Sequence, residues 1–303
     1  MKVFQSISQF KSNKKTTVTI GTFDGVHLGH QSLLKKLKTN SSCESVLITF
    51  FPHPRMVLQV ESEIILLNTI EEKTILLESN NIENLIIHPF DKAFSRLTAE
   101  EFVEDILVKQ LNIDTLIIGH DHRFGRNRSA TVDDLIDFGK KYNFNVEQIS
   151  AKEINEIAIS STKIRSALDN GNIKLANSYL GYCYNLNGKV IKGLQNGRSI
   201  GFPTANILIE ENYKLIPKNG VYAVKTTLKN KTVFGMLNIG TNPTVNLNKQ
   251  SIEVHFFDFN DNIYDEKISL SLLNYFREEQ KFNSLEALKE QLLLDKEAVL
   301  KSL

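Results

Sequence analysis

The sequence TTVTIGTFDGVHLGHQSLL (16–34) joins a short apolar strand to a helix through a glycine-rich turn. Every residue of TTVTI (16–20) is β-branched, which favours an extended strand. In the helix that follows, Leu33, Leu34 and Leu37 fall on one face. The glycines of the turn let the backbone approach a ligand closely, and the helix N-terminus beside them favours a phosphate.

The same alternation of strand and helix continues along the chain. Further strands are expected at SVLITF (45–50), NLIIHPF (84–90) and DTLIIGH (114–120), and helices at 71–79, 99–110 and 131–141. Strands separated by helices predict an α/β domain with a doubly wound parallel sheet. In such a sheet, ligands bind outside the carboxyl ends of the strands.

The pattern changes in the second half of the chain. A helix is expected over 161–181, with a break near Gly171. The short strand-like segments that follow are bounded by Gly, Asn and Pro, which is typical of an antiparallel β-barrel or sandwich. A last amphipathic helix covers 284–300, and Ser284 is a suitable N-cap for it.

Length and composition describe a soluble globular protein of two domains. The 303 residues are long for one domain, and the change of pattern predicts domains at 1–182 and 183–303. The 36 basic and 35 acidic residues give a net charge of +1, without the basic excess usual in nucleic-acid-binding proteins. Cys43 and Cys183 form neither a disulfide framework nor a metal-ligand spacing.

The N-terminus lacks an apolar signal core, and no apolar run approaches the length of a membrane span. These features predict a cytoplasmic protein with neither a nucleic-acid nor a membrane partner. They leave its oligomeric state open.

His27 and His30 stand at the start of the first helix as an HxGH pattern. A spacing of three places both on one face, where two imidazoles beside a helix dipole suit charge building up on phosphate oxygens. The alternative is a glycine-rich turn with two incidental histidines. A second segment, ISSTKIR (159–165), combines hydroxyls, cations and the backbone amides of a helix start, which together can bind a triphosphate. Taken alone, this segment would be an ordinary helix cap.

Together, GTFDGVHLGH (21–30) and ISSTKIR resemble the motifs of the nucleotidyltransferase superfamily. The resemblance implies that the histidines stabilise the transition state at the α-phosphate of ATP and that the arginine holds the phosphates. It assigns catalysis to His27, His30 and Arg165, and ATP binding to Gly21, Phe23, Asp24, Gly25, Ser161 and Thr162. Positioning and electrostatics suffice for such a transfer, so no covalent intermediate is expected.

Two loops that follow predicted strands narrow the family. TFFPHPRMVL (49–58) and GHDHRFGRNRSATVDDL (119–135) are similar to loops in the FMN adenylyltransferase module of bacterial FAD synthetases. The resemblance implies that the flavin and phosphate side of the cleft is lined by Pro52, His53, Pro54, Arg55, Asp121, Phe124, Gly125 and Arg128. The chain departs from the family at His120 and His122, where an aromatic residue or asparagine is frequent; a surface-loop role is the alternative for His122.

The most specific stretch is GKVIKGLQNGRSIGFPTANI (188–207), which lacks the Walker A pattern. It is similar to the riboflavin kinase signature G-R-x-x-G-[FY]-P-T-A-N, matched without a gap by Gly197, Arg198, Gly201, Phe202, Pro203, Thr204, Ala205 and Asn206. The resemblance assigns ATP binding to Gly197, Arg198, Gly201 and Pro203. Thr204 and Asn206 offer neutral oxygens to Mg²⁺. The alternative is a β-hairpin with a Pro-Thr turn.

Glu253 stands among apolar and aromatic residues in IEVHFFDF (252–259). A strand carboxylate that merely faces water is the alternative, but by resemblance the acid of this segment is the catalytic base of riboflavin kinase. FREEQKFNSLEALKEQL (276–292) resembles the C-terminal stretch of the kinase, which implies that Arg277 and Phe282 approach the flavin. The alternative there is a solvated charge run.

From about residue 16 to the C-terminus, the chain resembles bifunctional riboflavin kinase/FAD synthetase. The implied fold is an α/β nucleotidyltransferase-type doubly wound parallel sheet, followed by an antiparallel β-barrel with a C-terminal helix. The implied reactions convert riboflavin to FMN and FMN to FAD, with ATP and Mg²⁺. Three alternatives stay open: an enzyme with one active half, a flavin-binding regulator without turnover, and another adenylylated or cytidylylated substrate at the first site.

Overall fold

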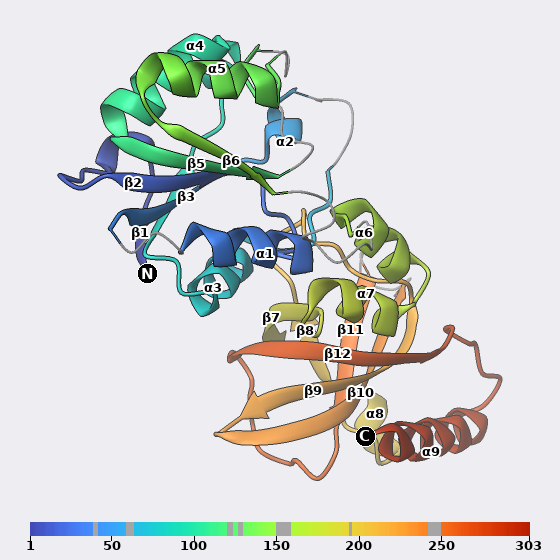
Figure 1. The fold of residues 1–303 in the computed structure, drawn as a ribbon. Helices are drawn as coiled ribbons and strands as arrows, with labels where there is room; N and C mark the ends of the chain where they lie inside the picture. The colour runs from blue at the N-terminus through green and yellow to red at the C-terminus, as the bar shows by residue number, and fades with distance from the viewer. Residues whose placement is uncertain are drawn as a thin grey trace. The chain divides into compact units, whose positions relative to one another are not determined.

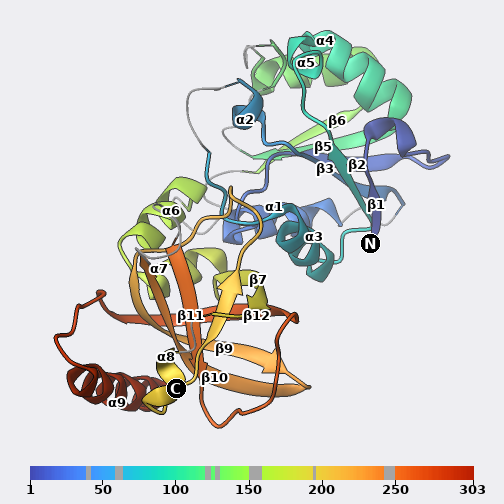
Figure 2. The ribbon, with the colours of Figure 1, turned by 180° about the vertical axis from the view of Figure 1, so that it is seen from behind.

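The computed structural model describes residues 1–38, 42–58, 64–119, 124–126, 130–149, 159–193, 196–241 and 250–303. They divide into two compact units, Met1–Ser160 and Ser161–Leu303. Figures 1 and 2 show the elements of each unit from opposite sides. Within the described ranges, no helix combines the length and the apolar character that a bilayer span requires.

A six-stranded sheet forms the centre of the first unit, in the order β1-β4-β3-β2-β5-β6 (Figure 1). Its strands are β1 (Lys2–Phe4), β2 (Thr16–Ile20), β3 (Glu44–Phe50), β4 (Asn84–His88), β5 (Ile113–Gly119) and β6 (Asn145–Ile149). Every neighbouring pair is parallel, which confirms the expected sheet. The strand order reverses beside β2, which has β3 on one side and β5 on the other.

Helices cover both faces of this sheet (Figure 1). They are α1 (Leu28–Leu37), α2 (Pro54–Leu58), α3 (Ile70–Ser79), α4 (Ala99–Glu101), the π-helix η3 (Phe102–Gln110) and α5 (Val132–Tyr142), with 3₁₀ turns η1 (Ile7–Gln9) and η2 (Phe94–Arg96). One core contains Leu34 of α1 and Leu77 of α3, and the other contains Leu107 of η3 and Leu135 of α5. Both faces of the sheet are therefore buried, as parallel strands require.

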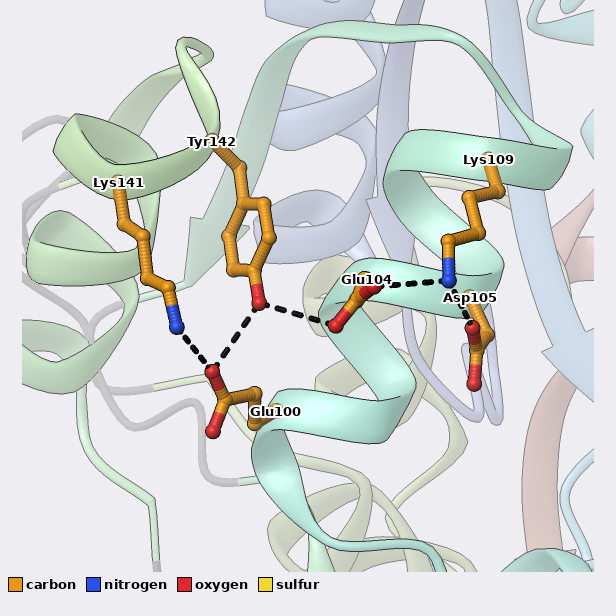
Figure 3. Close-up of polar contacts among 6 residues, drawn as sticks. All are labelled: Glu100, Glu104, Asp105, Lys109, Lys141 and Tyr142. Carbon is orange, nitrogen blue, oxygen red and sulfur yellow. Dashed lines mark hydrogen bonds and ion pairs between the residues drawn. The ribbon is translucent and has the colours of Figure 1, made fainter.

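Exposed polar side chains join α4, η3 and α5 on the outside of the first unit (Figure 3). The hydroxyl of Tyr142 lies 3.1 Å from a carboxylate oxygen of Glu100 and 3.2 Å from one of Glu104, and it can donate its single proton to either. Lys141 also pairs with Glu100, and Lys109 pairs with Glu104 at 2.8 Å. Exposed pairs of this kind contribute little to stability, so the apolar core beneath holds these helices in place.

The second unit begins with a helical hairpin, α6 (Ser161–Asp169) and α7 (Ile173–Leu180). The break expected near Gly171 is present, and Gly171 has a φ of 74°. Asn177 of α7 ties the hairpin to the strands that follow, because its side chain donates to the Leu272 carbonyl at 2.9 Å and accepts from the Tyr184 amide at 2.8 Å. The hairpin thus groups with the barrel, and residue 182, where the sequence predicts the domain boundary, lies just after it.

A closed antiparallel barrel follows, in the order β10-β11-β8-β7-β12-β9 (Figure 2). Its elements are β7 (Asn185–Ile191), α8 (Asn196–Ser199), β8 (Ala205–Leu208), β9 (Gly220–Leu228), β10 (Lys231–Thr241), β11 (Gln250–Phe256), β12 (Lys267–Arg277) and the C-terminal helix α9 (Leu285–Ser302). Ser284 caps α9 as expected, and its hydroxyl accepts from the Ala287 amide at 3.1 Å. Val299 of α9 packs in a core with Phe202 and Phe257, so the helix belongs to the barrel.

Two candidate active sites

The backbone between β2 and α1 forms a strained turn at the carboxyl end of β2. Gly21 donates its amide to the Ile48 carbonyl at 3.0 Å, which continues the contact with β3. Phe23 and Val26 have φ angles of 47° and 36°, and Gly25 between them has 87°. Side chains hold such angles only where their surroundings fix them, often at functional sites. The turn lies where the strand order reverses, which is the ligand-binding position of an open α/β sheet.

His27 and His30 stack on each other at the N-terminus of α1. Their ring centroids lie 3.7 Å apart with the planes at 16°, and Phe23 packs edge-on against His30 at 5.2 Å. His27 is the N-cap of α1, where its Nδ1 accepts from the His30 amide at 3.4 Å. Because Nδ1 accepts, a neutral His27 carries its ring proton on Nε2, from which it can donate to a ligand.

His30 is held in its neutral form. Burial keeps its pKa well below the ordinary value of 6.5, and neighbouring His27 and Lys73 act in the same direction. Its Nδ1 is buried and has no hydrogen-bond partner among the described residues. An uncharged imidazole here can donate to a phosphate oxygen without a change of protonation near neutral pH.

Asp24 anchors the turn to the segment that precedes α3. Its carboxylate is only 2% exposed, and Oδ1 accepts from the amides of Leu67 at 2.9 Å and Asn68 at 3.4 Å. Lys73 of α3 also interacts electrostatically with Asp24. Sequence reasoning did not single out Lys73, because a lysine in a helical pattern is ordinarily solvated.

The loop after β3 carries Pro52, His53 and Arg55. Pro52 and Arg55 are exposed, and His53 is partly buried. The Nδ1 of His53 accepts from the Arg55 amide at 3.1 Å, at the start of α2. The exposed guanidinium can therefore meet an anionic ligand beyond the end of the sheet.

The loop after β5 is described in part. Four residues that the sequence singles out lie outside the described ranges: Asp121, Arg128, His120 and His122. Phe124 is described, and its backbone forms a bridge with Ala130 through hydrogen bonds of 3.3 and 3.2 Å. Its buried ring lies 6.0 Å from that of Phe102, in the core under η3. Gly125 follows with a φ of 72°.

Ser161, Thr162 and Arg165 lie in the first turns of α6, in the second unit. Thr162 is exposed, whereas Ser161 and Arg165 are partly buried. Two hydroxyls and a guanidinium near a helix N-terminus can bind phosphate oxygens.

In the barrel unit, the GRxxGFPTAN segment forms α8 and a tight turn before β8. The Phe202 amide donates to the Gly197 carbonyl at 2.8 Å. A Cβ at Gly197 would lie 2.1 Å from the Phe202 carbonyl oxygen, so this turn requires glycine. Arg198 and Pro203 are exposed, and Gly201 adopts a φ of 84°. The loop can therefore present backbone and guanidinium groups to a phosphate.

Thr204, Asn206 and Glu253 meet where β8 pairs with β11. Asn206 and Glu253 are register partners, and the Thr204 hydroxyl donates to Oε2 of Glu253 at 3.2 Å. These oxygen donors fit Mg²⁺, a hard cation that keeps several waters. Among the described residues, no cluster of three or more His, Cys, Asp or Glu side chains could hold a metal ion.

Two residues outside the predicted site, Gly193 and His255, support this cluster. A Cβ at Gly193 would lie 2.1 Å from Nδ2 of Asn206, so the amide packs directly on the glycine backbone. Nδ1 of His255 lies 2.8 Å from the Pro203 carbonyl oxygen and must be the donor, since a carbonyl only accepts. Burial lowers the pKa of His255, and this hydrogen bond opposes the lowering. Both contacts fix the segment that carries Thr204.

Arg277 is engaged with the C-terminal helix. Its Nε and terminal nitrogen contact the two oxygens of Asp295 at 2.9 and 2.6 Å, and Gln291 donates to the same carboxylate at 2.9 Å. The centroid of the Phe282 ring lies 6.0 Å from Cζ of the Arg277 guanidinium. A bidentate pair of this kind anchors α9 to the end of β12 and holds the guanidinium in a fixed plane.

Comparison with known proteins gives two families in this order. The FAD synthetase family model matches residues 9–163, and the riboflavin kinase family model matches residues 180–303. A bifunctional riboflavin kinase/FMN adenylyltransferase of Buchnera aphidicola subsp. Schizaphis graminum is 41% identical over 309 residues, which cover 99% of this chain and 98% of that protein. The Haemophilus influenzae protein of the same name is 38% identical, with 92% of each chain covered.

A solved structure shares the fold of the whole chain. It is the crystal structure of a macrolide-efflux protein from Streptococcus pneumoniae, with a TM-score of 0.89 and 29% identity. The match covers 98% of this chain and 97% of that one. Both the sheet and the barrel therefore occur together in a known fold.

Proposed function

The chain belongs to the family of bifunctional riboflavin kinase/FMN adenylyltransferases, and from this premise we propose which residues perform each reaction. It is a transferase that phosphorylates riboflavin to FMN and adenylylates FMN to FAD, with ATP, riboflavin and FMN as substrates. Adenylylation belongs to a domain of residues 1–182 and phosphorylation to a domain of residues 183–303. The order of the two family models along the chain supports this division.

For riboflavin phosphorylation, the proposal is carried by the hydrogen bond from Thr204, just before β8, to Glu253 of β11 and by the register pairing of Glu253 with Asn206 of β8. Glu253 takes the proton of the ribityl hydroxyl while the hydroxyl oxygen attacks the γ-phosphate of ATP, and ADP leaves. Thr204 and Asn206 would hold Mg²⁺, which supplies neutralisation of phosphate charge when bound. The ATP phosphates are assigned to Gly197, Arg198, Gly201 and Pro203.

For FMN adenylylation, the FMN phosphate attacks the α-phosphate of a second ATP, and pyrophosphate leaves. His27 and His30 donate hydrogen bonds to the α-phosphate oxygens as charge builds up on them. Their stacking at the N-terminus of α1 supports this role, because the helix dipole and the ring N–H groups then favour the same anion. The other ATP contacts are assigned to Arg165, Ser161, Thr162, Gly21, Phe23, Asp24 and Gly25.

The flavin contacts of the first domain are assigned to Pro52, His53, Arg55, Asp121, Phe124 and Arg128, and those of the second to Arg277 and Phe282. The anchoring of Arg277 by Asp295 supports the assignment of Arg277 to the flavin contacts, because a fixed guanidinium can bind or stack against a planar ring without further ordering. We also propose that the protein acts in the cytoplasm on small molecules, without a nucleic-acid or membrane partner. The net charge of +1 supports this.

The test is to incubate the purified protein with riboflavin, ATP and Mg²⁺ and to separate the flavins by chromatography over time. FMN should appear first and FAD later, and omission of Mg²⁺ should stop FMN formation. FMN without FAD would contradict the assignment of the first domain. Conversion of added FMN to FAD with riboflavin unchanged would contradict the assignment of the barrel, and no conversion at all would favour a flavin-binding regulator.

A further inference from the structure

Lys73 is a buried lysine beside the turn that carries the HxGH histidines. It lies near the start of α3, and only 2% of the residue's surface is exposed. A lysine is rarely buried this fully without a partner. A cation near a helix N-terminus also opposes the helix dipole, so α3 itself gains nothing from this charge. The reason for its burial therefore lies in its contacts outside the helix.

The ammonium of Lys73 contacts the backbone of the strained turn. Nζ donates to the Thr22 carbonyl at 2.7 Å, and the hydroxyl of Thr49 donates to the same oxygen at 3.2 Å. Thr22 directly precedes Phe23, whose φ of 47° is unfavourable for a side chain. Strained backbone persists only where its surroundings hold it, and Lys73 supplies a hydrogen bond at that point.

Two ionisable groups, Asp24 and His30, interact electrostatically with this ammonium, and a third, Glu72, precedes Lys73 in α3. Burial lowers the pKa of Lys73 to about 8, and the buried Asp24 carboxylate on the turn opposes this lowering because it attracts the ammonium. On α1, the pKa of His30 is lowered by burial, and the positive charges of His27 and Lys73 add to this lowering. On α3, the neighbouring Glu72 is engaged as a helix cap, where Oε2 accepts from the Thr69 amide at 3.0 Å. Asp24 and Lys73 thus form a buried pair of opposite charge, with an uncharged His30 beside it.

We propose that Lys73 is a positioning residue for FMN adenylylation, which holds the 21–26 turn through its hydrogen bond to the Thr22 carbonyl. The proposal rests on the proposed role of His27 and His30 at the α-phosphate. Lys73 itself contacts the turn, so it contributes to FAD formation through the position of the turn.

The test compares Lys73→Met and Lys73→Arg with Lys38→Met. Lys38 is an exposed lysine at the end of α1 that likewise donates to a backbone carbonyl, that of Asn80 at 3.0 Å. Methionine keeps the length of Lys73 without its charge or its donors, so kcat for FAD formation from FMN should fall about 100-fold. Riboflavin phosphorylation in the same molecule reports whether the chain is folded, and Lys38→Met should stay within about twofold in both reactions.

The pH profile separates this role from a merely structural one. Wild-type FAD formation should decline above about pH 8, where Lys73 loses its charge and its hydrogen bond to the Thr22 carbonyl weakens to that of a neutral amine. Arginine stays charged, so Lys73→Arg should lack that decline even if its rate is reduced. In Lys73→Met the acid limb should move to higher pH, since the positive neighbour of His30 is gone.

Two results would overturn the proposal: FAD formation by Lys73→Met within about twofold of Lys38→Met, or an alkaline decline that Lys73→Arg leaves unchanged. If Lys73→Met does not fold, the Lys73→Arg profile decides by itself. A wild-type protein that makes no FAD from FMN would instead reject the proposed function of the first domain.

Discussion

The hydroxyl of Thr204 donates to the Glu253 carboxylate at 3.2 Å, across the pairing of β8 with β11. Glu253 is also the register partner of Asn206, so the proposed base lies opposite one residue proposed to hold Mg²⁺ and accepts a hydrogen bond from the other. The hydrogen bond keeps the lone pairs of the threonine oxygen and the second carboxylate oxygen available for other ligands. The proposed base and the proposed metal ligands can therefore be tested separately by substitutions that preserve their shapes.

Replacing Glu253 with glutamine tests the base. Glutamine keeps the size of the side chain and can still accept from Thr204, but it cannot take up a proton. FMN formation should therefore fall about 10² to 10⁴-fold. Conversion of added FMN to FAD provides the control, because it should proceed at the wild-type rate. A glutamine variant with normal riboflavin phosphorylation would mean that another group is the base.

Replacing Thr204 with valine tests the metal ligand. The change removes one oxygen donor and keeps the shape, so the Mg²⁺ concentration for half-maximal FMN formation should rise about tenfold or more. Thr226→Val is the matched control, since Thr226 is buried in the same barrel and its hydroxyl has no partner among the described residues. That control should leave the Mg²⁺ dependence unchanged and the stability unchanged or raised. Equal Mg²⁺ dependence in both variants would exclude Thr204 as a ligand.

The elements that carry the two sites were predictable because their local patterns agree with their environments. In β2 all five residues are β-branched and buried, and the expected apolar face of α1 is buried at Leu33, Leu34 and Leu37. The break at Gly171 also follows from the sequence, since a left-handed residue ends a helix. The doubly wound sheet and the barrel follow from these elements and their order.

Other features depend on contacts that no short pattern contains. The edge strand β6 was missed because most of its side chains are exposed, and β1 because it has three residues. The helix expected at 99–110 is mostly the π-helix η3, which apolar spacing alone does not distinguish from an α-helix. Lys73 and Gly193 could not be predicted, because each derives its importance from a residue distant in the sequence, Thr22 or Asn206.

The pair of Arg277 with Asp295 predicts how α9 is attached. Replacing Asp295 with asparagine removes a charged acceptor and leaves a guanidinium that is 18% exposed without its counter-charge. The barrel unit should lose about 2 to 3 kcal/mol of unfolding free energy. Urea unfolding followed by tyrosine fluorescence measures this, because the chain has 8 tyrosines and no tryptophan, and all but Tyr142 lie in the second unit.

Glu297→Gln serves as the control for that measurement. Glu297 pairs with Lys301 at 2.7 Å on the exposed side of the same helix. Loss of such a solvated pair should not change the unfolding midpoint measurably. Equal midpoints for the Asp295 and Glu297 variants would mean that the Arg277 contact does not stabilise the attachment of α9.

The neutral state of His30 predicts that the first unit loses stability in acid. The pKa of His30 in the folded chain lies well below its ordinary value of 6.5. As the pH falls through 6.5, the unfolded chain therefore binds a proton that the folded chain excludes, so stability present above that pH is progressively lost below it. A His30→Gln variant lacks this proton and should show a shallower decline of stability between about pH 7 and pH 5. Thermal unfolding followed by circular dichroism, with the barrel transition identified by tyrosine fluorescence, measures both slopes; an identical slope in the variant would mean that folded His30 binds its proton as the unfolded chain does.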